Sequence, residues 1–172
     1  MKKLFFAIAL SVCYFSGMAQ DNVTAGQAKA ITANTMANFT QSVSFAYTKG
    51  ITLGDFKRKI CGSAVPLDAG NGMIETAYFY LSNSVTKDQI IKENDGIAVA
   101  KAFKYLLDQH NKGFANSDGS ELFGGKQNLD APVAKATGCR WYQFWCLVEQ
   151  FANWVVANWP TIQVILQYFN IP

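Results

Sequence analysis

The feature that most constrains the fold of this chain is an aromatic, almost uncharged stretch near its C-terminus. Residues 138–160 read GCRWYQFWCLVEQFANWVVANWP and hold all four tryptophans of the 172-residue chain. From Trp141 to Pro172 the only charged side chain is that of Glu149. A segment of this composition has to bury its apolar side chains in a protein core, in a membrane interface or against a partner.

Placed on a helix from Trp141 to Trp159, the segment divides into a broad apolar face and a narrow polar stripe. The apolar face consists of Trp141, Phe144, Trp145, Val148, Phe151, Ala152, Val155 and Trp159. The polar stripe consists of Gln143, Glu149, Gln150 and Asn153. Pro160 is expected to end this helix, because proline has no backbone N–H to donate.

Two interpretations of the apolar face are open. In the first it is core, because a helix that is hydrophobic nearly all round is usually buried in its own protein. In the second it engages a membrane interface or a hydrophobic protein partner. Tryptophan and tyrosine favour the headgroup region of a bilayer, whereas the amide side chains disfavour a transmembrane helix. The contact residues expected under the second interpretation are Trp141, Phe144, Trp145, Val148, Phe151, Val155 and Trp159.

Cys139 and Cys146 lie at the start of this segment. Within one continuous helix they would be about two turns apart, too far for a disulfide. A Cys139–Cys146 bridge therefore requires that Cys139 precede the helix. The alternative is a bridge from Cys61 to one of them, which would tie the tail to the rest of the chain.

The N-terminus has the pattern of a cleaved secretory signal peptide over residues 1–19. Two lysines precede an apolar run over 4–15, and small residues at positions 17 and 19 suit signal peptidase. The expected location is therefore secreted or periplasmic. A lipoprotein anchored through Cys13 is the alternative, although Val12 is bulky for a lipoprotein box and the apolar run continues past the cysteine.

Residues 20–113 show helical patterns and no convincing two-residue alternation of the kind that strands display. Apolar residues recur at helical spacing within 24–50, 52–62, 72–82, 84–94 and 97–113. The glycine-rich positions 70–72 are expected to separate two of these helices. The predicted fold is all-α: a small irregular helical bundle with an apolar, Trp-rich C-terminal helical segment over 139–172.

A connector loop is predicted over residues 114–138, between the helical body and the tail. Residues 113–138 hold five glycines, and a stretch of this length and composition is typical of a functional loop or a linker. Phe114, Leu122 and Phe123 are the candidates to anchor parts of it. Basic residues at positions 126, 135 and 140 offer cleavage sites to a trypsin-like protease.

No pattern in the chain nominates a reaction centre or a cofactor site. The single histidine, His110, lies near the end of a predicted helix, where it suits the helix dipole. A calcium loop starting at residue 116 would have Glu121 where it needs glycine and Gln127 where it needs a bidentate acid, and residues 119–126 miss the phosphate-loop spacing. Without Lys2 and Lys3 the 15 basic residues become 13, against 12 acidic ones, and they are scattered. Neither nucleic-acid binding nor enzymatic activity is therefore expected.

The layout of signal peptide, helical body, glycine-rich connector and Trp-rich tail is shared by secreted toxin and bacteriocin precursors. We therefore expect an exported, non-enzymatic helical protein whose tail engages a membrane interface or a hydrophobic partner. The alternative is a periplasmic or extracellular helical binding protein in which the tail is core and lines an apolar ligand pocket. A hydrolase that the sequence does not reveal is the third class.

Overall fold

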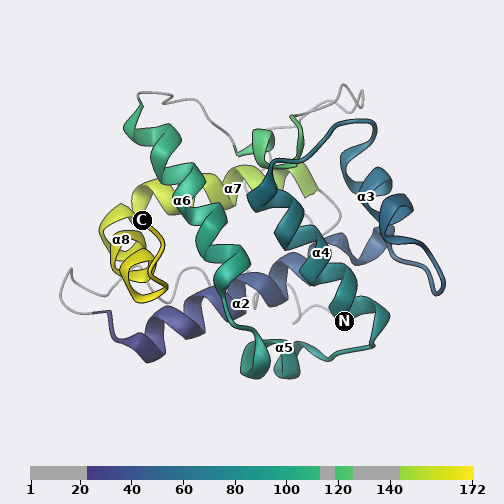
Figure 1. Ribbon diagram of the computed structural model, residues 1–172, viewed down its shortest axis with the longest axis horizontal. Coiled ribbons are helices and arrows are strands. Elements are labelled where there is room, and N and C mark those ends of the chain that lie inside the picture. The colour runs from purple at the N-terminus through teal and green to yellow at the C-terminus, as the bar shows by residue number, and fades with distance from the viewer. Residues whose placement is uncertain (1–22, 113–118, 126–143) are drawn as a thin grey trace, which may run out of the picture.

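The computed structural model describes residues 23–112, 119–125 and 144–172, which together form an irregular bundle of helices (Figure 1). The α-helices are α2 (Ala25–Val43), α3 (Leu53–Cys61), α4 (Asp68–Ser82), α5 (Lys87–Glu93), α6 (Ile97–Asn111), α7 (Phe144–Ala157) and α8 (Trp159–Tyr168). Two short 3-10 helices, η1 (Ser44–Ala46) and η2 (Ser120–Phe123), accompany them. The described residues contain no strand, and the all-α prediction is confirmed.

Helix α2 runs across the bundle and contacts α4, α5, α6 and α8 (Figure 1). It begins after Thr24, whose hydroxyl accepts the backbone N–H of Gln27 while the Gln27 side chain accepts the backbone N–H of Thr24. This capping box starts the helix despite the glycine at position 26. The helix ends at Val43, before the end of the range 24–50 over which the sequence shows helical spacing, because η1 turns the chain.

Helix α4 begins earlier than the sequence predicts. It starts at Asp68 and contains the glycine-rich positions 70–72, so the predicted interruption there was wrong. The reason is a tertiary contact: a Cβ at Gly70 would overlap the carbonyl oxygen of Leu122 in η2. The backbone N–H of Leu67 donates to the same oxygen at 3.1 Å. The first turn of α4 is therefore docked on η2.

The corner between α5 and α6 is held by buried polar groups. Thr86 caps α5, again with a capping box. The Asn94 amide donates to the hydroxyl of Tyr80 at 2.9 Å, and its Oδ1 accepts the backbone N–H of Gly96 at 2.8 Å. These two bonds satisfy the amide group of Asn94, a residue that is 3% exposed, and they fix the direction in which α6 leaves the corner.

The core lies where α2, α4 and α6 meet, and α7, α8 and η2 complete it. Figure 1 shows α7 passing behind α6 and α8 standing at one end of the bundle, and both helices contact α6 and α2. Part of the predicted connector also belongs to this core, because Leu122 and Phe123 are fully buried. Residues 114–118 and 126–138 of the predicted connector, and the predicted signal peptide, lie outside the described residues.

Candidate functional site in the C-terminal helices

The aromatic segment forms two helices, not one helix followed by an apolar tail. Helix α7 ends at Ala157, and the backbone N–H and side-chain amide of Asn158 both donate to the carbonyl of Trp154. Pro160 does not end the run but lies in the first turn of α8. A residue without an N–H is tolerated there, because that N–H has no partner within the helix.

The predicted apolar face of α7 exists, and in the intact chain most of it faces the protein's own core. Phe144 and Val148 are 5% exposed, and Val155 is fully buried. Trp145 and Phe151 are half-buried and pack against the core, whereas Trp159 is 46% exposed. Trp141 lies outside the described residues. The first of the two interpretations therefore describes the packing of α7 in the intact chain.

The polar stripe of α7 also lies where the sequence placed it. Gln150 and Asn153 are exposed and, together with Ala157, mark the solvent edge of the helix. Glu149 is half-buried beside this edge. Gln143, the first member of the predicted stripe, falls outside the described residues.

Three phenylalanines of the remaining chain receive the aromatic side chains of α7: Phe39 of α2, Phe103 of α6 and Phe123 of η2. We call these three residues the aromatic cradle. At one end of it, the Phe123 ring lies 5.5 Å from Phe39 and 5.2 Å from Phe144. Phe39 also lies 6.2 Å from Phe144, edge to face. Distances and angles of this kind are those at which aromatic pairs attract.

At the other end of the cradle, Phe103 alone contacts two aromatic residues of α7. Its ring stacks on Phe151 with centroids 5.5 Å apart, and it lies 5.9 Å from the ring of Trp154. Phe103 is fully buried. Helical spacing predicts that Phe39 and Phe103 point inward, but it carries no information on which helix they meet there.

Helix α8 buries Ile162, Ile165 and Leu166. Trp159 at its first residue and Tyr168 at its last are 46% and 44% exposed, at opposite borders of an outward face that also carries Gln163, Val164 and Gln167. Phe169, at the C-terminal end of α8, packs closely against the α5–α6 corner: a Cβ at Gly96 would lie 2.6 Å from its ring. The sequence did not predict α8 as a helix of its own.

The interface between the C-terminal helices and the other described helices is apolar. No backbone hydrogen bond and no ion pair joins a described residue of 144–172 to a described residue of 23–125. As far as both partners are described, the backbone hydrogen bonds of α7 and α8 stay inside these helices and the turns next to them. Hydrophobic burial and aromatic contact therefore hold the two parts together.

The cysteines differ in state. Cys146 is disulfide-bonded, and Cys61 is a free, buried thiol at the end of α3. The alternative of a bridge from Cys61 to the tail is therefore wrong. Cys139 lies outside the described residues, so the Cys139–Cys146 pair stays a prediction. Burial raises the pKa of Cys61 to about 11, against a smaller lowering by Lys57, so this thiol is protonated at neutral pH.

The described residues bring no recognisable reaction centre together. Cys61 is protonated and buried, and Cys146 is disulfide-bonded, so neither offers a thiolate to His110, which is exposed in the last turn of α6. In the same part of the chain, no group of three or more histidine, cysteine or acidic side chains gathers to hold a metal.

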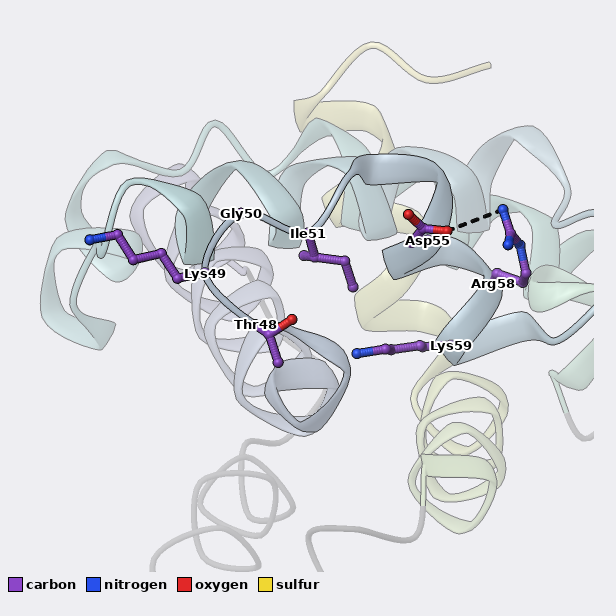
Figure 2. A pocket seen from close by; sticks show the side chains of 7 residues that line it. All are labelled: Thr48, Lys49, Gly50, Ile51, Asp55, Arg58 and Lys59. Carbon is purple, nitrogen blue, oxygen red and sulfur yellow. Dashed lines mark ion pairs between the residues drawn. The ribbon is translucent and has the colours of Figure 1, made fainter.

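Two surface hollows are lined mainly by polar side chains. The first lies beside the start of α3 and is lined by Thr48, Lys49, Gly50, Ile51, Asp55, Arg58 and Lys59. Figure 2 shows Lys59 extending toward Thr48, and Arg58 paired with Asp55 at 3.2 Å. The second lies between α4 and α6, around Glu75 and Lys101. Neither is lined by α7 or α8, as an apolar ligand pocket of the predicted kind would be.

Comparison with known proteins does not place the chain in a family. No protein-family model matches it, and no curated protein and no solved structure gives a significant match. Among the helices of the described residues, none combines the length and apolar character needed to cross a bilayer.

Proposed function

We propose that this protein is the exported precursor of a membrane-active segment, residues 139–172, which the helical body keeps covered. The observation that carries the proposal is the nature of α7 and α8. Within the described residues, these helices form an amphipathic pair with one charged side chain, and their buried side chains share the hydrophobic core of the body. No backbone hydrogen bond links the described residues of this pair to those of the body, so none of that kind has to break when the pair leaves.

A membrane interface suits the composition of this pair. Tryptophan and tyrosine place an apolar ring and one polar group at the level of the headgroups. The exposed amides of Gln150 and Asn153 suit the wet side of a helix that lies in the interface. Because the segment carries almost no charge, apolar burial drives its insertion, and anionic lipid adds little.

The body has the role of a cover in this proposal. The side chains that would enter the lipid, among them Phe144, Val148 and Val155, are buried in the intact chain. The intact protein should therefore bind and disturb membranes far less than the separated segment. Export through the predicted signal peptide of residues 1–19, and the absence of an enzymatic activity, are parts of the same proposal.

Burial of the same side chains also favours a second candidate function. If α7 is permanent core, the protein is an exported helical binding protein, as the alternative interpretation has it. The two functions differ in what the isolated segment does: a permanent core helix has no reason to partition into lipid.

The test uses a synthetic peptide of residues 139–172, oxidised to close the predicted Cys139–Cys146 ring. We expect it to release dye from phosphatidylcholine vesicles and to shift its tryptophan fluorescence to the blue, with similar potency on vesicles that contain anionic lipid. The full-length protein at the same concentration should release little dye.

Matched variants separate the two faces of α7. In the peptide, Val148→Asn with Val155→Asn places amides on the apolar face and should lower leakage at least about tenfold, because burying unpartnered amides opposes insertion. Asn153→Gln keeps the solvent edge polar and should leave leakage unchanged. A wild-type peptide that does not partition into either kind of vesicle would refute the membrane role and leave the binding protein as the better proposal.

A further inference from the structure

We propose that cutting the connector does not by itself free the C-terminal segment: the body retains it as a noncovalent partner through the aromatic cradle until a lipid surface displaces the body. This inference rests on the proposed function and adds its regulation. It follows from the described contacts of α7 and α8 with α2, α6 and η2, which lie outside residues 126–138 and remain in place when the chain is cut there.

A cut in the connector leaves the described contacts of α7 and α8 unchanged. The buried side chains of these helices contact α2, α6 and η2, and these three elements lie outside residues 126–138. Cutting turns an intramolecular contact into one between two chains and removes only the effective concentration that the linkage supplied. An interface packed like a protein core persists under those conditions.

Phe103 sets how strongly the body retains the C-terminal segment. Helix α6 contacts both α7 and α8, and Phe103 is its fully buried aromatic residue that contacts Phe151 and Trp154. Fully buried aromatic anchors at the centre of an interface carry most of its binding energy. Close backbone approach adds shape complementarity, because a Cβ at Gly119 would lie 3.0 Å from the Cβ of Ala152.

Lipid, and not salt, is expected to reverse retention. The described contacts between the two parts are apolar and aromatic, and salt does not weaken apolar burial, so salt should not separate them. The acyl region of a bilayer offers α7 apolar surroundings equivalent to those of the cradle. Trp159 and Tyr168 are exposed while α8 is docked, so a membrane has aromatic side chains to contact before the body is displaced.

The experiment uses the full mature chain with a specific protease site inserted after Gln127. After cutting, the two fragments should co-elute from a size-exclusion column at low micromolar concentration, both in dilute buffer and in molar salt. Addition of phosphatidylcholine vesicles should carry the C-terminal fragment into the floating fraction and leave the body behind. If the wild-type fragments separate on cutting alone, without lipid, the inference is overturned.

Two phenylalanine substitutions form the matched pair. Phe103 and Phe56 are both fully buried, but Phe56 packs against Tyr47 and Tyr78, away from the C-terminal helices. In the cut protein, Phe103→Ala should raise the dissociation constant of the two fragments at least about tenfold, whereas Phe56→Ala should leave it unchanged. Equal weakening by both substitutions contradicts the role given to Phe103.

If Phe103→Ala does not fold, Phe103→Leu takes its place, because leucine keeps apolar volume and removes the ring stacking. A dissociation constant of the two fragments equal to that of wild type then counts against the role of Phe103.

Failure of the inference and failure of the proposed function are distinguishable. Retention is read by co-elution without lipid, whereas the proposed function is read by leakage with the peptide alone. Fragments that separate on cutting, beside a peptide that permeabilises vesicles, sink the inference and leave the function standing.

Discussion

Gly70 shows how one missing side-chain atom decides where a helix begins. Any Cβ at this position would overlap the carbonyl oxygen of Leu122, which also accepts the N–H of Leu67. Gly72 lies on the same helix, but a Cβ there would have the Cβ of Ala98 at 4.0 Å as its nearest neighbour outside the helix. Two glycines of one helix therefore have different physical roles.

We predict opposite effects on stability for alanine at these two positions. Gly70→Ala should lower the free energy of unfolding by about 1–3 kcal/mol, because backbone has to move to admit the methyl group. Gly72→Ala should raise it by about 0.5–1 kcal/mol, because alanine loses less conformational freedom in a helix. Urea denaturation of both variants measures the two shifts, and shifts of the same sign would contradict the close contact with η2.

Cys61 gives a pH dependence whose sign follows from its burial. The thiol has a pKa of about 11 in the folded chain against a reference of 9.0, so the unfolded chain loses this proton first as the pH rises. The stability that it contributes is therefore complete below pH 9 and is lost progressively between pH 9 and 11.

Cys61→Ala should flatten the fall of unfolding free energy over this range, as measured by urea titrations at pH 8 and pH 10.5. The native wild-type thiol should also react slowly with iodoacetamide at pH 8 and rapidly once the chain is unfolded. Fast alkylation of the folded chain would show that Cys61 is accessible.

At the scale of the element, helical spacing predicted faces better than ends. Within α7, the described residues of the apolar face and of the polar stripe lie where the sequence placed them. The ends of α4 and α7 do not, because each is set by a contact that is distant in sequence or by a turn. The prediction treated Pro160 as a stop, yet the turn at Asn158 lets it start α8.

Two of the three residues predicted to anchor the connector do so. Glycines at 119, 124 and 125 predict a loop, and all three have positive φ in turns around η2. The two apolar residues between them, Leu122 and Phe123, are fully buried. Glycine content reports the backbone conformations that a segment adopts, but burial of that segment depends on what packs against it.

At the scale of the whole molecule, the body and the C-terminal helices share one hydrophobic core. Phe103 and Phe39 are covered by aromatic residues of α7, and Ile162 and Ile165 of α8 are fully buried in the same cluster. A body that has lost the segment therefore exposes apolar surface.

We predict that a mature chain ending at residue 125 folds loosely. It should bind the dye ANS much more strongly than the full-length protein and lose its cooperative thermal unfolding, because several core side chains lose their neighbours. Far-ultraviolet and near-ultraviolet circular dichroism, recorded beside the full-length chain, check the retention of helix and the loss of fixed packing. A truncated chain that unfolds as sharply and at the same temperature as the intact one would show that the body has a core of its own.

The sequence by itself determined that the described chain is helical, that the C-terminal segment is amphipathic and nearly uncharged, and which of its side chains share a face. These properties depend on residue spacing and on the chemistry of single side chains, which act over one or two turns of a helix. Only the tertiary structure decided that this face meets Phe39, Phe103 and Phe123, that the first turn of α4 docks on η2 at Gly70, and that Cys61 stands apart from the disulfide of Cys146. Each of these depends on residues far apart in the chain, because hydrophobic burial is non-directional and selects no partner until the whole core is packed.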